Sequence, residues 1–249
     1  MAATVFLVPA VPAPGATFVL DGDEGRHAAA VRRIRVGERL VLSDGAGHLA
    51  GCTASAVGRA DVTLVCDEAW EVPQPRPRVT VVQAIPKADR ADLAVELATE
   101  AGADAIVPWQ ASRCVARWDG KADKAVARWR AVARAAAKQA RRAWVPTVSE
   151  LHDTVRLVRL LTSMDAKVFV LHEGSTGSLR THDFSVTSDV VIVVGPEGGI
   201  SPEELDALAA VGAQPVLLGP TVLRTSTAAA VALGALGVIT DRWAHTPPG

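Results

Sequence analysis

The stretch from Asp189 to Glu204 constrains the fold more than any other part of the sequence. Residues Val190 to Val194 are apolar at every position, and such a strand is buried on both faces, as in a parallel sheet. A glycine-rich turn, Gly195-Pro196-Glu197-Gly198-Gly199, follows, and Ser201-Pro202-Glu203-Glu204 has the N-cap, proline and capping-box glutamate of a helix start. Open α/β sheets bind ligands at such turns, although a turn that binds nothing fits this stretch alone equally well.

The composition is that of a globular protein with a buried core. The chain has 249 residues, of which 49% are apolar and 21% charged, enough for one large or two modest domains. Its three cysteines, Cys52, Cys66 and Cys114, are far apart, which argues against a zinc site or a disulfide framework and fits a reducing cytoplasm. The first 20 residues lack the basic start of a signal peptide, and no apolar run reaches the ~20 residues of a membrane span. We therefore expect a cytoplasmic protein without a metal.

The first 72 residues have the pattern of a small β domain. Strands are predicted at 4–8, 16–20, 39–43, 48–57 and 61–66, a spacing typical of a small barrel. Residues 26–37 are the exception, because they predict a short helix that ends near Arg33 and carries several cationic side chains; a solvated surface and a phosphate-binding patch fit it equally well. Residues 71–78 alternate proline with polar residues, as an extended spacer does. We therefore expect domains at 1–72 and 73–249.

Strands and helices alternate along the rest of the chain. Strands are predicted at 79–85, 105–109, 167–171, 190–194 and 215–218, and helices at 89–101, 122–143, 151–163, 202–211 and 226–240. This alternation predicts an α/β domain with a mostly parallel sheet.

Positive charge is concentrated in the middle of the chain. The net charge is −3 over residues 1–72, +6 over 73–150 and −4 over 151–249. On the helix predicted at 122–143 and just before it, basic residues occupy about one half of the helical wheel. They are Lys121, Lys124, Arg128, Arg130, Arg134, Lys138, Arg141 and Arg142. A solvated face usually mixes glutamate with lysine, so a face of one sign favours a phosphate backbone as its partner.

Two further loops resemble the turn at Gly195 in their position. Leu218-Gly219-Pro220 ends the strand that follows in the sequence, and Leu171-His172-Glu173-Gly174 ends the one before. We expect the loops after 190–194 and 215–218 to lie at neighbouring strands and to form a crevice for an adenosine-like ligand. The sequence contains no Gly-x-Gly-x-x-Gly fingerprint, no phosphate-binding P-loop, no Gly-x-Ser-x-Gly elbow and no metal-ligand spacing.

Together these motifs resemble the SPOUT methyltransferases, and more narrowly the RsmE-type family that methylates N3 of a uridine in 16S ribosomal RNA. The resemblance rests on Gly195 to Gly199, on Leu218-Gly219-Pro220 with Leu223-Arg224-Thr225, and on His27-x-x-x-Val31-x-Arg33 and Gln139-x-x-Arg142. It implies an amino-terminal PUA-like barrel that binds RNA and a carboxy-terminal α/β domain with a deep trefoil knot. It also implies S-adenosylmethionine bound in the knot, a homodimer, and 16S rRNA within the small ribosomal subunit as the partner.

The resemblance also assigns roles to individual residues. The residues expected to bind S-adenosylmethionine are Leu171, His172, Glu173, Gly195, Pro196, Glu197, Gly198, Gly199, Ile200, Leu218, Gly219, Pro220, Leu223, Thr225, Ser226 and Ala228. Together with the basic segments, the resemblance gives the residues expected to bind RNA: Arg26, His27, Arg32, Arg33, Lys87, Arg113, Arg128, Arg134, Lys138 and Arg142. For Arg113 and Arg142, contact with RNA or the active site and a packing or salt-bridge role fit equally well. Two positions depart from the family pattern, because Lys138 and Ser226 stand where many relatives have glutamate.

Arg224 is the expected catalytic residue. Methylation of uridine N3 removes a proton, and the anion that forms spreads onto the flanking carbonyl oxygens, where a cation stabilises it. Arginine stays protonated, so Arg224 would be an electrostatic stabiliser, and no side chain is identified as the base. Two other functions remain open from the sequence: a non-catalytic RNA-binding protein that keeps the barrel and the basic helix, and a small-molecule α/β enzyme.

Overall fold

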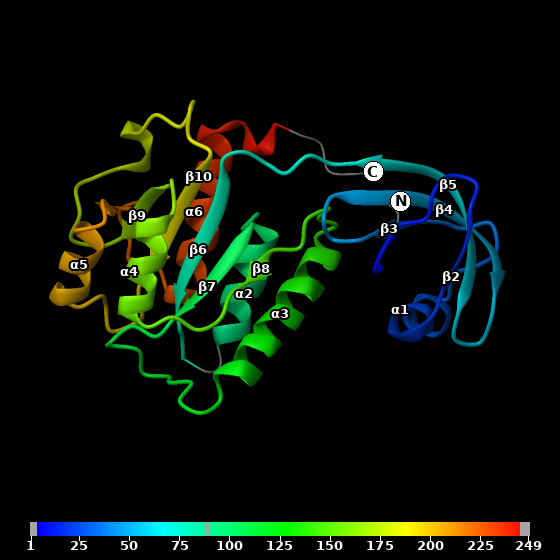
Figure 1. Cartoon of the computed structure of the whole chain (residues 1–249), viewed down its shortest axis with the longest axis horizontal. Helices are drawn as coiled ribbons and strands as arrows, with labels where there is room; N and C mark the ends of the chain where they lie inside the picture. The colour runs from blue at the N-terminus through cyan, green and yellow to red at the C-terminus, as the bar shows by residue number, and fades with distance from the viewer. Residues whose placement is uncertain (1–3, 88–89, 245–249) are drawn as a thin grey trace. The chain divides into compact units, whose positions relative to one another are not determined.

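A computed structural model describes residues 4–87 and 90–244. They form two compact units, shown in Figure 1. Among the described residues, the first unit contains 4–74 and 137–145, and the second contains 75–87, 90–136 and 146–244. The predicted helix start at Asp89 lies outside the described residues.

The first unit is built on a five-stranded sheet. Its strands are β1 (Thr4–Leu7), β2 (Thr17–Leu20), β3 (Arg39–Ser43), β4 (His48–Val57) and β5 (Val62–Glu71), in the order β1-β3-β4-β5-β2. β1 is parallel to β3 and the other pairs are antiparallel. β5 continues beyond its predicted end at Cys66 because Asp67 and Glu68 face outward and pair across the sheet, Asp67 with Thr53 and Glu68 with Arg39.

A short helical segment covers the core of this sheet. It consists of α1 (Gly22–Arg26) followed by a π-helical turn, η1 (His27–Arg32), and it ends at Arg33, whose φ of 54° is left-handed. The predicted end near Arg33 is thus confirmed. Ala28 is fully buried and packs with Phe6, Leu40 and other apolar residues of the sheet.

Helix α3 (Ala122–Gln139) has its last residues in the first unit and the rest in the second. It was predicted to reach Ala143, but Arg141 takes a left-handed φ of 54°. The amides of Arg141 and Arg142 turn back to the carbonyls of Lys138 and Ala137 at 3.1 and 2.8 Å, the Schellman pattern of a helix end. In the first unit Trp144 then donates from Nε1 to the carbonyl of Val72 at 2.9 Å.

The second unit contains a six-stranded sheet whose pairs are all parallel, so the predicted α/β domain with a parallel sheet is confirmed. Its strands are β6 (Arg78–Ala84), β7 (Ala105–Trp109), β8 (Thr147–Val148), β9 (Lys167–Leu171), β10 (Asp189–Val194) and β11 (Gln214–Val216). Their order is β11-β9-β10-β6-β7-β8. β8 was not predicted, because a two-residue strand has no periodicity of its own.

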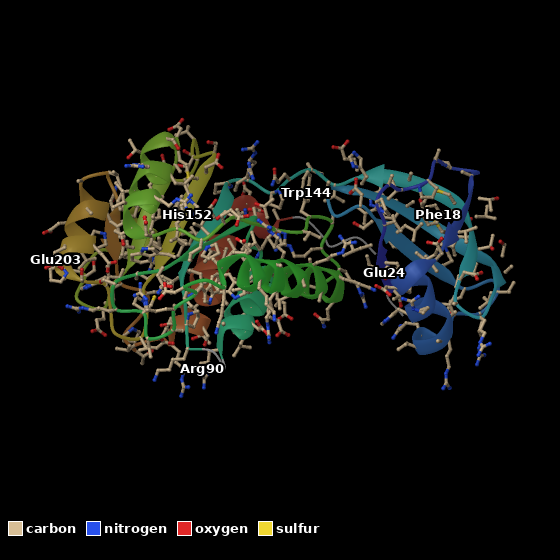
Figure 2. The ribbon with its side chains drawn as sticks, turned by 60° about the horizontal axis from the view of Figure 1, so that its bottom comes forward. Phe18, Glu24, Arg90, Trp144, His152 and Glu203 are labelled. Carbon is tan, nitrogen blue, oxygen red and sulfur yellow. The ribbon has the colours of Figure 1, made fainter. Side chains whose placement is uncertain are left out.

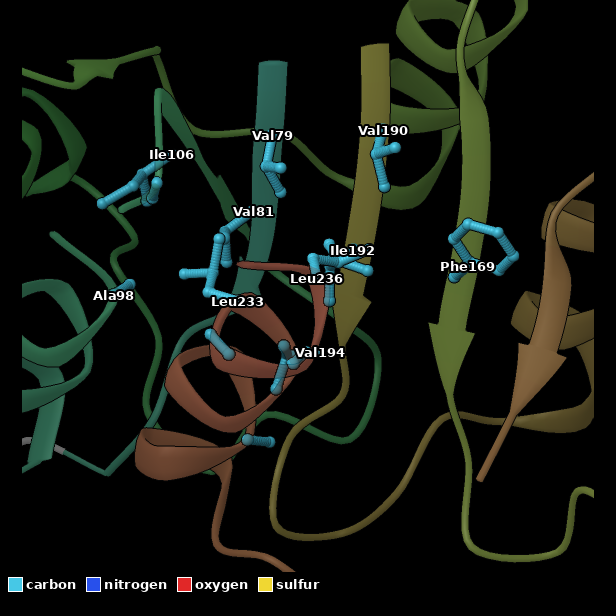
Figure 3. Packing of buried hydrophobic residues seen from close by; sticks show 14 of the residues in the cluster. Val79, Val81, Ala98, Ile106, Phe169, Val190, Ile192, Val194, Leu233 and Leu236 are labelled. Carbon is cyan, nitrogen blue, oxygen red and sulfur yellow. The ribbon is translucent and has the colours of Figure 1, made fainter. Parts of the chain in front are cut away.

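Helices cover both faces of this sheet. The remaining helices are α2 (Ala91–Glu100), α4 (Thr154–Ser163), α5 (Pro202–Ala209), α6 (Thr225–Ile239) and the 3₁₀ helices η3 (Leu179–Thr181) and η4 (Asp241–Trp243). Along β10, Val190, Ile192 and Val194 pack with residues of α2, α3 and α6, as Figure 3 shows in part. Val191 and Val193 pack with residues of α4 and α5 on the other face. A central strand apolar at every position is therefore explained by burial on both sides.

The last described helix, η4, is fixed to the start of the unit. Arg242 donates to the carboxylate of Asp104 at 2.8 Å and to the carbonyls of Pro77 and Gly102. Asp104 also accepts from the amide of Val79 at 2.8 Å. In the ion pair the side chains of Arg242 and Asp104 are 4% and 1% exposed. Across the part of the chain that the structure describes, no helix has the length and apolarity needed to cross a membrane.

Candidate functional site

Three loops meet at one edge of the parallel sheet. They follow β9, β10 and β11, and since these strands run in the same direction, their carboxyl ends share an edge. The expectation that β10 and β11 are neighbours is wrong, because β9 lies between them. Sequence order does not determine strand order in such a sheet, since the connections cross over its faces. The three loops nevertheless converge.

These loops line a cavity of about 910 Å³ that is open to solvent. The residues predicted to bind S-adenosylmethionine that line it are Leu171, His172, Glu173, Gly195, Pro196, Glu197, Gly198, Gly199, Ile200, Leu218, Gly219, Pro220, Leu223, Thr225 and Ala228. Arg224, Lys87 and Arg113 line it too. Sequence reasoning missed five lining residues: Arg90, Val194, Leu217, Thr221 and Val222. Arg90 lies at the start of α2 (Figure 2), three residues after Lys87. Its closeness in sequence to Lys87 was the signal that could have indicated its place at the cavity.

The loop after β10 presents main chain to the cavity. A Cβ on Gly195 would lie 2.6 Å from Cγ1 of Ile200, so a larger residue would displace the loop. Gly199 has a φ of +74°, where other residues are strained, and a Cβ there would meet no atom within 4 Å. Its amide donates to the carbonyl of Pro196 at 2.9 Å, which closes the turn. The glycines thus allow the close approach of a ligand to the backbone.

The loops after β9 and β11 line the cavity from the same sheet edge. The Nδ1 atom of His172 accepts from the amide of Gly174 at 3.1 Å, which leaves Nε2 to carry the proton in the neutral ring. Gly219 has a φ of +85° and open space at its Cβ position. The amide of Leu217 donates to the carbonyl of Gly177 at 2.8 Å, which ties the two loops together.

Ser226 does not line the cavity. It is 1% exposed, and in the described residues its Oγ has no hydrogen-bond partner. Beside it, Gln83 donates from Nε2 to the carbonyls of Ala84 and Thr225 at 3.1 and 3.3 Å, which ties the start of α6 to β6. Ser226 lies in the first turn of α6 on a buried side of the helix, which explains why it is not at the surface of the cavity although it is adjacent to Thr225.

Cationic side chains surround the cavity. Lys87, Arg90, Arg113 and Arg224 line it with two carboxylates, those of Glu173 and Glu197. Glu197 accepts from the amide of Lys87 at 3.3 Å, and Nη1 of Arg113 lies 3.5 Å from the carbonyl of Gly198. The excess of positive charge suits an anionic ligand. No group of three or more potential metal ligands is found among the described residues.

The basic face of α3 is partly neutralised by acidic partners. Arg128 forms two hydrogen bonds with Asp92 through Nε, at 3.0 and 2.8 Å, and Arg130 pairs with Glu150 at 2.7 Å. These partners come from other elements, so the sequence of the helix alone could not indicate them. The view of this face as one of a single sign is therefore incomplete.

The predicted RNA-binding residues of the first unit also differ in their surroundings. Lys138 pairs with Glu24 of α1 and lies 4.9 Å from the centre of the Phe6 ring, so it has a structural role beside any contact with RNA. The others have varied surroundings: Arg26 pairs with Asp23, Arg32 donates to Thr4, His27 packs edge-on against Phe6, Arg33 is exposed and Arg142 is half-buried. In the second unit, Arg134 is exposed on α3.

Comparison with known proteins identifies both parts of the chain. The family described as RNA methyltransferase domain matches residues 73–237, and the family described as RNA methyltransferase PUA domain matches residues 20–65.

Individual relatives match over almost the whole chain. A Mycobacterium bovis protein named ribosomal RNA small subunit methyltransferase E is 55% identical over 98% of this chain and 94% of its own. The Neisseria gonorrhoeae protein of the same name, solved bound to S-adenosyl methionine, has a TM-score of 0.85 at 25% identity and covers 96% of this chain and 98% of its own. A Legionella pneumophila methyltransferase solved with bound SAM has a TM-score of 0.84 at 28% identity, with the same coverage. The chain therefore belongs to the ribosomal RNA small subunit methyltransferase E family, as its motifs indicated.

Proposed function

We propose that the protein transfers a methyl group from S-adenosylmethionine to N3 of a uridine in the 16S rRNA of the small ribosomal subunit. The observation that carries this proposal is the cavity of about 910 Å³ whose lining includes three glycine-bearing loops and four cationic side chains. The loops suit a nucleoside ligand and the cations suit RNA. The Neisseria gonorrhoeae family member and the Legionella pneumophila methyltransferase, both similar in fold to this chain, have been solved with the methyl donor bound.

The residues around the cavity fit this donor. Gly199 and Gly219 combine a left-handed backbone with open space at the Cβ position, so the main chain there is accessible to a ligand. The bound donor supplies a methyl group on a positively charged sulfur. The protein contributes mainly position, because an in-line displacement requires N3, the methyl carbon and the sulfur to be aligned. The loops after β9, β10 and β11 would fix the donor through main-chain groups. Donor binding by all sixteen residues that the sequence analysis names for it, Ser226 included, stays a proposal.

Arg224 stabilises the uridine anion in this mechanism. It is exposed at the N-cap of α6 and lines the cavity. Its charge would lower the energy of the anion formed when N3 loses its proton to solvent. Arg224→Ala should lower kcat on the order of 100-fold, with little change in the dissociation constant of the donor. An equal loss of donor affinity would place Arg224 in donor binding instead.

RNA contacts are proposed on both units. Arg26, His27, Arg32, Arg33, Lys138 and Arg142 belong to the first unit, and Lys87, Arg113, Arg128 and Arg134 to the second. We also propose the domain division at 1–72 and 73–249, the deep trefoil knot and a cytoplasmic location. The match of the RNA methyltransferase PUA family to residues 20–65 supports RNA binding by the first domain.

A homodimer is also proposed. Helix α6 carries exposed apolar side chains at Val231, Val238 and Ile239, which are 44%, 75% and 37% exposed. Val222 in the preceding loop is 78% exposed. Large apolar side chains exposed to solvent in this way favour association. Light scattering during size-exclusion chromatography should give twice the mass of the chain, and Val238→Asp should give the single mass.

The proposal is tested by mapping 16S rRNA from a strain that lacks the gene. N3-methyluridine should be absent there and should return when the gene is supplied. If the modification persists without the gene, the assigned substrate is wrong. Calorimetry separates the enzyme from a non-catalytic RNA-binding protein, because the latter would not bind S-adenosylmethionine at millimolar concentration. A small-molecule enzyme would show no salt-dependent binding to RNA.

A further inference from the structure

The carboxylate of Glu204 connects three segments beside the glycine-rich loop. Glu204 is 5% exposed and forms a capping box with Ser201 at the start of α5. The box uses one acceptor, toward the amide of Ser201 at 3.2 Å. The same carboxylate also accepts from the amide and hydroxyl of Ser112 at 2.8 and 2.9 Å and from the hydroxyl of Thr154 at 2.8 Å. A helix cap does not require these three additional bonds.

The bonds to Ser112 fix a turn that carries Arg113. The amide of Cys114 donates to the carbonyl of Ala111 at 3.1 Å, so Ser112 and Arg113 are the central residues of this turn. Ala111 and Cys114 are buried on either side, whereas Ser112 and Arg113 are exposed.

The Arg113 turn rests on the glycine-rich loop. A Cβ on Gly198 would lie 3.1 Å from the carbonyl oxygen of Arg113 and 3.2 Å from its Cβ. Glycine at position 198 therefore allows the two loops to touch. Glu204 holds the turn through Ser112 while Gly198 supports it, so the location of the Arg113 side chain depends on both.

A buried hydrogen-bond chain holds Glu204 from the other side. Trp109, at the end of β7, donates from Nε1 to the hydroxyl of Thr154 at 3.2 Å, and that hydroxyl donates to Glu204. Burial alone would raise the pKa of Glu204, but the bonds from Ser112, Thr154 and Ser201 lower it below its ordinary value. The carboxylate is thus ionised near neutral pH, and hydrogen bonds to an ionised acceptor are the strong ones.

We propose that Glu204 is a positioning residue that holds the Arg113 turn against the glycine-rich loop, so that the Arg113 guanidinium is fixed at the cavity for the phosphodiester of the RNA substrate. This inference rests on the proposed function, since it requires RNA to reach this cavity. Glu204 itself contacts no substrate and acts through Ser112. Removing its charge should therefore weaken RNA binding only as long as Arg113 is present.

A double-mutant cycle in the full chain tests this dependence. The dissociation constant of the small ribosomal subunit is measured with S-adenosylhomocysteine present, for the unaltered protein, Glu204→Gln, Arg113→Ala and the double variant. An amide at position 204 turns an NH₂ group toward donors, which breaks at least one bond to Ser112 or Ser201. We expect Glu204→Gln to weaken binding about tenfold in the presence of Arg113 and less than twofold in its absence.

Two further variants keep the test decisive. Thr154→Val removes one bond to the same carboxylate without touching the Arg113 turn, and it should weaken RNA binding less than threefold. Ser112→Ala removes one donor and leaves the helix cap intact, so it serves where Glu204→Gln does not fold, and its effect should also vanish with Arg113→Ala.

The outcomes separate the inference from the function. Equal losses with and without Arg113, or an equal loss from Thr154→Val, would overturn the positioning role alone. If the unaltered protein bound neither RNA nor S-adenosylmethionine, the proposed function would fail, and the positioning role with it.

Discussion

Replacing Arg242 by methionine measures how much the buried ion pair stabilises the second unit. Methionine keeps the apolar stem but removes the guanidinium that binds Asp104 at 2.8 Å and two carbonyls. Breaking a buried pair from one side costs about 3–5 kcal/mol, because a buried charge is left uncompensated. Since Asp104 keeps its hydrogen bond from Val79, we expect the lower end of this range, about 3 kcal/mol.

Two companion variants determine the origin of that loss. Arg242→Met combined with Asp104→Asn should cost less than the sum of the single changes, by about 1–3 kcal/mol, as coupled neighbours do. The matched control is Arg117→Met, which breaks a surface pair with Asp119 of 3.1 Å and side-chain exposures of 53% and 76%. Exposed pairs contribute less than about 1 kcal/mol.

Urea denaturation, with hydrogen exchange of β6 as a probe of this unit, gives the free energy of unfolding of each variant. A loss for Arg242→Met no larger than that for Arg117→Met would refute the reasoning, because the pair would then behave as if exposed. Additive single and double changes would refute the coupling between the two side chains.

Three other predictions concern donor binding, stability and pH. Gly199→Val should abolish binding of S-adenosylmethionine in calorimetry. Glu197→Gln keeps an acceptor oxygen for the Lys87 amide and should lower the affinity for the donor less than tenfold. A larger loss from Glu197→Gln than from Gly199→Val would contradict the main-chain role of the loop. Lys138→Glu should lower the free energy of unfolding by about 2 kcal/mol, since it faces Glu24, and Glu24→Lys should restore it; failure of this rescue would contradict the pairing. Because the folded pKa of Glu204 is lowered, its stabilisation is complete above the unfolded pKa of about 4.3 and is lost as pH falls through the folded value. Between pH 3 and 7, the free energy of unfolding should therefore fall less on acidification in Glu204→Gln than in the unaltered protein. An equal fall in both would contradict a lowered pKa of Glu204 in the folded state.

The buried strands could be predicted closely from the sequence. The bounds of β7 and β9, Ala105–Trp109 and Lys167–Leu171, are the predicted ones, because apolar residues at successive positions are bounded by turn residues. The order of the strands could not be predicted, since it depends on crossovers whose direction local patterns do not encode. This is why β9 was not expected between β10 and β11.

The ends of helices and the partners of charged side chains were harder to predict from the sequence. The end of α3 depends on the left-handed backbone of Arg141, a conformation that sequence reasoning assigns to glycine or asparagine. The pairs Arg128–Asp92 and Lys138–Glu24 join residues 36 and 114 positions apart. The glycine-rich loops of the candidate site were visible as motifs, whereas Arg90 and the bonds around Glu204 depend on tertiary packing.

The bond from Arg242 to Pro77 has a consequence for synthesis on the ribosome. It joins residues 165 positions apart, and Gln83 of β6 is joined to Thr225 across 142 positions. Domains fold during translation only once their interacting segments have left the ribosome. We therefore expect β6, the first strand of the second unit, to reach its final contacts only after almost the whole remaining chain has been made. Nascent chains that stop before α6 should have no donor cavity. The protein would become competent to bind its donor in a single late step.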